Sequence, residues 1–232
     1  MPLEIKSTSE MKDPKVDALV YGRAGTGKTL LGGTFPKPIF VDTDNGLLSL
    51  RKKNVSFISC HRKSGPKWWN EVREATKLAL ESKDHESIII DQFPLVCEAM
   101  LISICSQNRK QKPTFDEWVA LWNGTQEYIA MVRASTKNSL FICGEIFERD
   151  EISGKVWCLP ALQGQAKTKV DHLFDEIYHA EATSVSGKPA KYSLSIRPDG
   201  TSTAKSRALS ATSTENSIDP HYSNIKNLIL RG

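Results

Sequence analysis

The sequence lacks any apolar run that approaches the roughly 20 residues of a membrane-spanning helix, which excludes a helical integral membrane protein. Residues 1–15 are polar and of mixed charge, and they lack the apolar core of a secretory signal. We therefore expect a cytoplasmic protein that makes no membrane contact.

Cysteine is scarce and irregularly spaced. The chain has five cysteines, an odd number with no Cys-x-x-Cys pair, and its five histidines are not paired at ligand spacing. These spacings predict neither a disulfide framework nor a zinc site. Cys97 and Cys143 lie in apolar runs, where cysteine usually acts as a small buried side chain.

The excess of one charge is also small. Lys and Arg number 31 against 27 Asp and Glu, which gives a formal net charge of +4. Such an excess permits a nucleic-acid partner without requiring one, and a solvated surface is the simpler explanation of the charge alone. The length of 232 residues and a hydrophobic share of 39% are ordinary for a globular protein with a substantial core.

Short apolar runs and longer periodic stretches alternate along the chain. Runs rich in β-branched and aromatic residues predict strands at 16–21, 38–42, 55–59, 87–91 and 139–143. Apolar residues at helical spacing predict helices over 67–82 and 115–137, with their tryptophans packed in the core. This alternation implies an α/β fold with a mostly parallel sheet flanked by helices.

The pattern changes after about residue 175. Residues 176–180 and 192–196 resemble antiparallel strands, and Pro198-Asp199-Gly200 is typical of a hairpin turn. A Ser/Thr-rich linker then precedes a short last helix. We expect one domain: an N-terminal segment (1–15), a core (16–209) whose sheet these strands extend, and a linker with the C-terminal helix (210–232).

The most informative motif directly follows the first predicted strand. Residues 22–29 match G-x-x-x-x-G-K-[ST] at every position. The glycines let backbone N–H groups crowd around phosphate oxygens, the lysine reaches the β- and γ-phosphates, and the threonine hydroxyl binds Mg²⁺. The N-terminus of the next helix favours the anion. We predict that ATP and Mg²⁺ are held by Gly22, Arg23, Ala24, Gly25, Thr26, Gly27, Lys28, Thr29 and Leu30.

Acidic residues at the ends of two predicted strands complete the expected site. Asp91 follows a buried run and is the natural second Mg²⁺ contact beside Thr29. Asp42 and Asp44 end another strand, and one of them is expected to position or deprotonate the attacking water. We favour Asp44, because ligands bind at the carboxyl tips of strands in open α/β sheets. Asp42 is either the alternative or an acid that tethers the loop.

The order of these motifs resembles that of the RecA-like core ATPases. The phosphate loop is followed by FVDTDNG (40–46), IIID (88–91) and LFICGE (140–145). Within that family the chain is most similar to small phage-encoded single-domain members, the fourth of the Sak groups, which are described as single-strand annealing or recombination proteins. The resemblance implies a RecA-like P-loop NTPase core and an ATPase acting in the cytoplasm of a phage-infected bacterium.

The resemblance also implies roles for later residues. Lys205 and Arg207 resemble a Lys-x-Arg pair that reaches the γ-phosphate of a neighbouring subunit, which implies a homo-oligomeric ring or filament; ordinary surface charge is the alternative. The family usually has Glu where Asp44 stands, and a polar Gln or His as γ-phosphate sensor where Glu145 stands. These departures predict slow hydrolysis, and a carboxylate at position 145 fits poorly near a phosphate unless a lysine or Mg²⁺ offsets it.

By the same resemblance, loops after the third and fourth core strands bind single-stranded DNA. Mobile basic loops with an occasional aromatic side chain, here Trp157, suit phosphate contact and base stacking without sequence readout. Solvated surface loops are the alternative. The matching stretches are 106–114, with Arg109, Lys110 and Lys112, and 148–169, with Arg149, Lys155, Lys167 and Lys169.

Two classes of function remain open. One is a DNA-dependent ATPase that coats or anneals single strands in phage recombination, with a single-strand-binding protein as a further partner. The other is an ATP-driven helicase loader, packaging protein or switch. A small-molecule kinase has less support, because the sequence has no arginine-rich lid. Lys205, Arg207 and the basic loops favour the first class.

Overall fold

A computed structural model describes residues 7, 14–63, 65–184, 186–210 and 212–231. Most of the predicted N-terminal segment (1–15) lies outside these residues. No helix in these ranges is both long and apolar enough to span a membrane.

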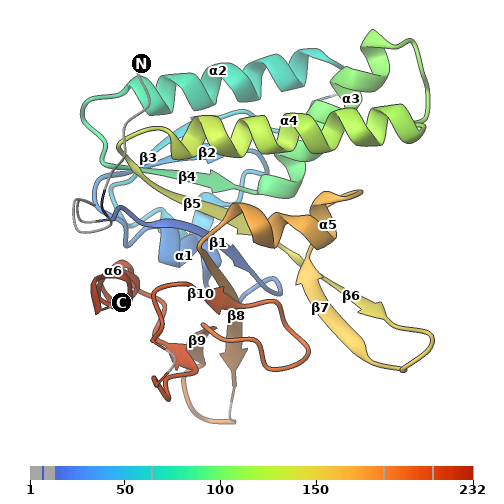
Figure 1. The fold of residues 1–232 in the computed structure, drawn as a ribbon. Helices are drawn as coiled ribbons and strands as arrows, with labels where there is room; N and C mark the ends of the chain where they lie inside the picture. Colours follow the sequence, from blue (N-terminus) through green and yellow to red (C-terminus); the bar gives the residue numbers. More distant parts are fainter. Residues whose placement is uncertain (1–6, 8–13, 64, 185, 211, 232) are drawn as a thin grey trace.

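The described strands build one large sheet and a separate hairpin (Figure 1). The large sheet has nine strands in the order β11-β9-β8-β1-β5-β4-β2-β3, with β10 paired to β8. The strands β8, β1, β5, β4, β2 and β3 pair with one another in parallel. The strands are β1 (Asp17–Tyr21), β2 (Pro38–Asp42), β3 (Ser56–Ser59), β4 (Ser87–Asp91), β5 (Asn138–Cys143), β8 (Glu176–Thr183), β9 (Lys191–Ser195), β10 (Lys205–Ser206) and β11 (Ser217–Ile218). The predicted α/β class with a mostly parallel sheet is confirmed.

Helices cover both faces of the sheet, and alternate strand residues divide between two cores. One core joins Leu19, Val41 and Ile90 to the three long helices, and the other joins Val20 and Phe40 to the short helices on the opposite side. The long helices are α2 (Lys67–Glu81), α3 (Phe93–Gln107) and α4 (Phe115–Arg133); the short ones are α1 (Lys28–Gly32) and α6 (Tyr222–Arg231). Single turns of 3-10 helix lie at Leu47–Leu50 and Val170–Leu173.

Helix α3 was not predicted from the sequence. It follows β4 after a single residue and is apolar around much of its circumference, with buried Val96, Cys97, Ala99 and Met100. A helix buried on most sides shows no amphipathic stripe, so periodicity cannot reveal it. Helix α4, by contrast, begins at a capping box. The Thr114 side chain accepts a hydrogen bond from the backbone of Glu117, and the Glu117 side chain accepts one from the backbone of Thr114.

Half of the stretch 148–169, predicted to be a mobile loop, is instead regular structure. Strands β6 (Glu145–Arg149) and β7 (Val156–Pro160) form an antiparallel hairpin, and α5 (Ala166–Lys169) follows it. Figure 1 shows this hairpin extending away from the large sheet. The prediction missed both strands: β6 has charged residues at three of its five positions, and β7 is an uncharged run of only five residues.

The C-terminal third extends the sheet as predicted. Strand β8 is parallel to β1 and antiparallel to β9, which makes it the point where the sheet changes from parallel to antiparallel. The predicted linker contributes β11 to the edge, and α6 buries Ile225 and Leu228 against the sheet. Residues 212–231 therefore pack on the same body as the rest of the chain.

Candidate active site

The phosphate loop runs from the end of β1 to the start of α1, and its shape depends on glycine at two positions. Gly22 has a φ of 154°, and a Cβ atom there would lie 2.3 Å from the carbonyl oxygen of Ala180 in β8. Gly27 has a φ of 82°, in the left-handed region that other residues avoid. The loop is thereby held close against the middle of β8, at Ala180.

Lys28 lies folded onto this loop. Its Nζ donates hydrogen bonds to the carbonyl oxygens of Gly22 at 2.7 Å and Arg23 at 2.6 Å, and only 7% of the residue is exposed. Burial lowers the pKa of Lys28, and the charge of Asp91 opposes that shift. A phosphate anion in the loop would replace weak carbonyl partners by a full negative charge, which compensates the burial of the ammonium group.

Thr29 and Asp91 meet as the Mg²⁺ prediction requires. The Thr29 hydroxyl donates to Oδ2 of Asp91 at 2.9 Å, although the two residues come from α1 and β4. Oδ1 of Asp91 is buried and has no hydrogen-bond partner among the described residues. Burial raises the pKa of Asp91 to about 7, and the nearby Asp44 and Asp42 add to that effect. Mg²⁺ prefers such oxygen ligands, and a cation here would relieve the uncompensated burial.

The two acids after β2 have different surroundings. Asp42 is 1% exposed; its Oδ1 accepts hydrogen bonds from the backbone of Asn45 and Gly46, and its Oδ2 lies 3.3 Å from Nε2 of His61. Asp42 thus tethers the loop. Asp44 instead lines the cavity beside the phosphate loop, where loss of hydration and the charge of Asp42 raise its pKa. These contacts favour Asp44 as the residue that faces an attacking water.

A cavity of about 380 Å³ lies over the phosphate loop. Besides loop residues from Ala24 to Leu30, it is lined by Asp44, Gly46, Ser49, Gln92 and Tyr192. Sequence reasoning missed Tyr192, whose ring approaches Gly27 so closely that a Cβ there would lie 3.3 Å from it. The tyrosine comes from β9, far along the chain, and no local motif marks it.

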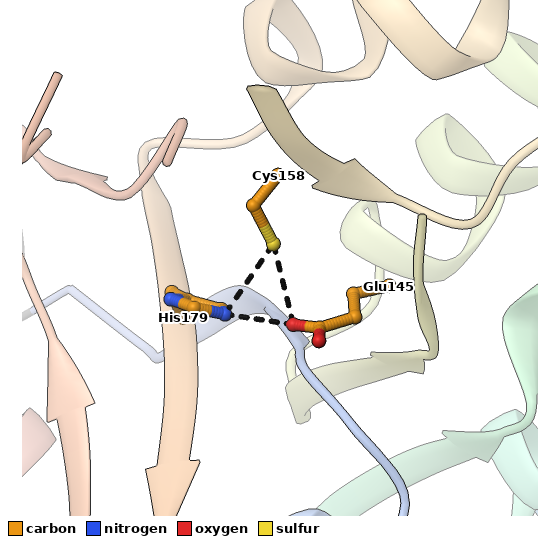
Figure 2. Close-up of side chains that lie close together, drawn as sticks. All are labelled: Glu145, Cys158 and His179. Atoms are coloured by element: carbon orange, nitrogen blue, oxygen red, sulfur yellow. Dashed lines mark hydrogen bonds and ion pairs between the residues drawn. The ribbon is translucent and has the colours of Figure 1, made fainter. Parts of the chain in front are cut away.

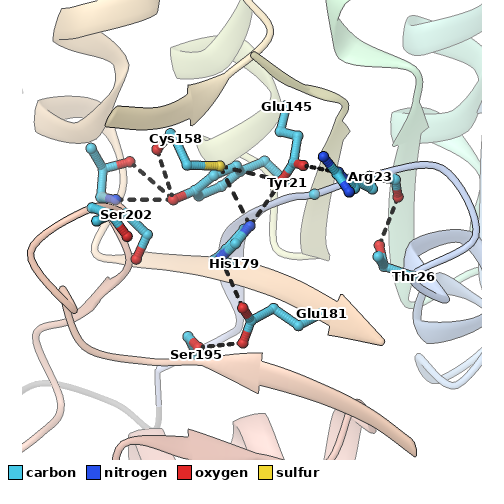
Figure 3. Close-up of polar contacts among 12 residues, drawn as sticks. Tyr21, Arg23, Thr26, Glu145, Cys158, His179, Glu181, Ser195 and Ser202 are labelled. Atoms are coloured by element: carbon cyan, nitrogen blue, oxygen red, sulfur yellow. Dashed lines mark hydrogen bonds and ion pairs between the residues drawn. The ribbon is translucent and has the colours of Figure 1, made fainter. Parts of the chain in front are cut away.

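Glu145 lies at the base of the hairpin, where it contacts Arg23 of the phosphate loop together with Cys158 and His179 (Figures 2 and 3). Its Oε1 accepts from Nε of Arg23 at 3.1 Å, and its Oε2 lies 2.9 Å from Nε2 of His179 and 3.2 Å from Sγ of Cys158. Burial alone would raise the pKa of Glu145, but these hydrogen bonds and the charge of Arg23 hold it below its usual range. The cation beside this carboxylate is therefore Arg23, where the sequence analysis expected a lysine or Mg²⁺.

The comparison with known families agrees with this geometry. The model of a family described as an AAA domain matches residues 14–208, most of the chain. The chain belongs to the AAA domain family. A search of curated proteins finds no match. The AAA domain carries the phosphate loop and the paired Thr29 and Asp91 of a P-loop ATPase, which binds nucleotide and usually Mg²⁺.

The AAA domain does not gather its candidate DNA contacts into one cluster. The first stretch joins α3 to α4 and the second forms the hairpin and α5, and Figure 1 shows them well apart. Some of the basic side chains have partners within the chain: Lys110 with Glu117, Lys167 with Glu148, Lys169 with Gln165, and Lys155 with the ring of Trp157. Arg109, Lys112 and Arg149 are exposed.

Lys205 and Arg207 lie in or just after β10, beside the first residues of β8. The phosphate loop follows the carboxyl end of β1, whereas the pair lies near the amino ends of β1 and β8. Neither residue lines the cavity. Lys205 donates to the carbonyl oxygen of Asp171, and Arg207 forms an ion pair with Asp175 at 2.5 Å. Within one subunit the pair therefore has no path to its own phosphate site.

Proposed function

We propose that this AAA domain is a DNA-dependent ATPase that binds single-stranded DNA on the β6–β7 hairpin. The observation that supports this most strongly is a contact between the hairpin and the phosphate loop. Arg23, a loop residue, bonds to Glu145 at the hairpin base and lies over the ring of Phe147 with its guanidinium carbon 5.5 Å from the ring centroid.

One face of the hairpin has the chemistry of a single-strand binding surface. Cross-strand partners point to the same side of a two-stranded ribbon, so the pairs Phe147↔Cys158 and Arg149↔Val156 share a face with Glu145. Phe147 is 55% exposed, and Arg149 is exposed beyond it toward the tip. An exposed ring beside a cation suits base stacking and phosphate contact without sequence preference.

The same face gives a route for coupling. A base stacked on Phe147 would compete with the guanidinium of Arg23 for the ring, and a displaced Arg23 would no longer hold Glu145 in the same way. Because Arg23 belongs to the phosphate loop, DNA binding would alter the charge beside the γ-phosphate. The side chain of Arg23 is 74% exposed, so this rearrangement requires no opening of the core.

Hydrolysis is assigned to the groups around the cavity. Lys28 binds the β- and γ-phosphates, Thr29 and Asp91 hold Mg²⁺, and Asp44 positions the attacking water. The aspartate acts as a base only in its ionised form, and its raised pKa makes it a stronger base than an ordinary aspartate.

Asp44→Asn is expected to lower turnover by roughly 10²-fold while nucleotide affinity stays within about threefold, because the amide keeps the shape and loses the base. The fold raises the pKa of Asp44, so it disfavours the ionised carboxylate. The folded protein therefore loses stability as the pH rises through that pKa. The variant should therefore melt at a higher temperature than wild type at neutral pH. At pH 3 the two proteins should melt at the same temperature.

Asp42→Asn is the matched control for this pair of measurements. It removes the charge that strengthens the hydrogen bonds from Asn45 and Gly46 and the contact with His61, and is expected to lower the melting temperature at neutral pH. If Asp42→Asn reduced turnover without loss of stability and Asp44→Asn left turnover unchanged, the roles of the two acids would be reversed.

Binding to single-stranded DNA is expected to weaken with salt, with a log–log slope that falls by about 0.7 for each phosphate contact removed. Arg149→Gln should reduce the slope. Neutralising Arg109, Lys110 and Lys112 together tests the α3–α4 connection in the same way. Phe147→Ala should weaken binding about tenfold at every salt concentration and leave the slope unchanged, since stacking carries no charge.

Lys52→Gln is the control for charge alone, because Lys52 is exposed but lies between the 3-10 turn at Leu47–Leu50 and β3. Fluorescence anisotropy with a labelled oligonucleotide measures each slope. Slopes and affinities that are equal in wild type, Arg149→Gln and Phe147→Ala would remove the hairpin from the binding site.

A role in phage recombination or single-strand annealing is the finer part of the proposal. It is supported by the likeness of the motif order in residues 22–145 to phage single-strand annealing ATPases, and by the exposed ring on the hairpin. An annealing assay with complementary strands coated by a single-strand-binding protein separates this role from that of a helicase loader. A loader would leave the annealing rate unchanged and would need a helicase to show activity.

A further inference from the structure

We propose that Glu145, Cys158 and His179 form a binding site for a transition-metal ion, with Zn²⁺ the best fit. Figure 2 shows the three side chains converging from β6, β7 and β8. They are the one such group of potential ligands that the described part of the chain brings together. The site is distinct from the Mg²⁺ site at Thr29 and Asp91, and the proposal does not depend on DNA binding.

The spacing of the three donor atoms suits a tetrahedral ion. Nε2 of His179 lies 2.9 Å from Oε2 of Glu145, Sγ of Cys158 lies 3.2 Å from the same oxygen, and Sγ lies 3.6 Å from Nε2. Zinc bonds of about 2.3 Å to sulfur and about 2.0–2.1 Å to nitrogen and oxygen place tetrahedral ligands about 3.3–3.6 Å apart. Shifts of a few tenths of an ångström would therefore admit the ion.

The donor types select the metal. A thiolate, an imidazole and a carboxylate form a mixed set that suits Zn²⁺, whereas Mg²⁺ and Ca²⁺ prefer oxygen alone. Three protein ligands leave a fourth position for water or another small ligand. Binding would release the thiol proton of Cys158 to solvent and use the Nε2 lone pair of His179, which leaves the ring proton on Nδ1.

The surroundings of His179 favour the metal-binding tautomer. Its Nδ1 is buried, has no hydrogen-bond partner among the described residues, and faces Oε1 of Glu181 at 3.9 Å. With a metal on Nε2, Nδ1 carries the proton and donates toward Glu181, an arrangement typical of metal-bound histidines.

Other contacts hold the three ligands in place (Figure 3). The ring of His179 stacks on Tyr21 with centroids 4.8 Å apart, and Oε1 of Glu145 accepts from Arg23, which leaves Oε2 for the metal. Glu181 in turn accepts a hydrogen bond from Ser195 at 3.2 Å. A bound ion would fasten the base of the hairpin to the sheet directly beside the phosphate loop.

Cobalt substitution tests the site without reference to hydrolysis. Tag-free, chelator-treated protein is titrated with Co²⁺ in excess Mg²⁺, which occupies the oxygen site. We expect one equivalent to bind with a thiolate-to-cobalt charge-transfer band in the near ultraviolet, and Zn²⁺ to displace it. Cys158→Ser should abolish the band, and His179→Gln should weaken binding at least about tenfold.

Cys105→Ser and His172→Gln are the matched controls, because neither residue belongs to the group, and both should bind like wild type. Each variant's melting curve establishes that it is folded. If Cys158→Ser is unfolded, two other results decide the question: the charge-transfer band of the wild-type protein, and the weaker Co²⁺ binding of His179→Gln. A wild-type titration with no charge-transfer band, or a band that persists in folded Cys158→Ser, overturns the proposal and leaves a hydrogen-bonded cluster.

Discussion

Lys28→Ala is expected to reduce ATP hydrolysis to background, a loss of at least roughly 10³-fold. In the structure Lys28 is buried against the carbonyl oxygens of Gly22 and Arg23, so its three donors are already aimed into the phosphate loop. Alanine supplies neither the charge nor the hydrogen bonds that the transferred phosphoryl group needs. Phosphate release measured with saturating ATP and Mg²⁺ gives the turnover.

Lys37→Ala is the matched control for Lys28→Ala. Lys37 is exposed and pairs with Glu86 at the opposite end of β2 and β4 from the cavity, so its loss should leave turnover unchanged. Undiminished hydrolysis by folded Lys28→Ala would contradict the assignment of this loop as the site of reaction.

Arg207→Ala is expected to lose roughly 10³-fold or more in turnover if Arg207 acts on the γ-phosphate of a neighbouring subunit. The geometry requires a neighbour, because Arg207 lies beside the amino end of β8 and does not line its own cavity. Specific activity should then rise with protein concentration. Mixing Arg207→Ala with Lys28→Ala should restore part of the activity, since some interfaces join an intact Lys28 to an intact Arg207.

The ion pair between Arg207 and Asp175 offers a control for a purely structural role. Asp175→Asn removes that pair, and the pair of Asp175 with Arg133, but leaves Arg207 in place, so the folded variant should retain hydrolysis if Arg207 acts in trans. A similar loss in Asp175→Asn and Arg207→Ala, or co-assembled mixtures that stay inactive, would show that Arg207 only stabilises the fold.

Sequence reasoning succeeded where one element carries its own signal. The strand before Gly22 and the buried run ending at Asp91 are each short, apolar and bounded by polar residues, and both appear as β1 and β4. Parallel strands end at the same edge, which is why Thr29 and Asp91 could be expected to meet. Helix α3 gave no such signal, since a helix buried on most sides has no periodic stripe.

The rest of the site depends on contacts between distant segments. Tyr192 reaches Gly27 only because β9 follows β8 back along the sheet, and His179 meets Glu145 only because β8 pairs with β1. Cys158 is 13 residues from Glu145 and 21 from His179, spacings that match no metal motif. Local patterns therefore missed the cluster that the tertiary fold assembles.

Of the two stretches predicted as basic DNA-binding loops, 148–169 contains a hairpin and a short helix, and its contact with DNA stays a prediction. Arg149 and Lys155 lie at the tip of a hairpin, not in a mobile loop, and a hairpin fixes which side chains share a face. That pairing places Phe147 and Arg149 on the same face of the hairpin as Glu145. Phe147 did not stand out in the sequence, because a lone aromatic residue in a strand usually faces a core.

The most direct test of this account is ATP hydrolysis with and without single-stranded DNA, compared between wild type and Phe147→Ala. We expect DNA to raise the turnover of wild type, and we expect Phe147→Ala to keep the basal rate but to show no rise, even at DNA concentrations that saturate the variant. Turnover that is the same with and without DNA in wild type, or a full rise in Phe147→Ala, would contradict coupling through the hairpin.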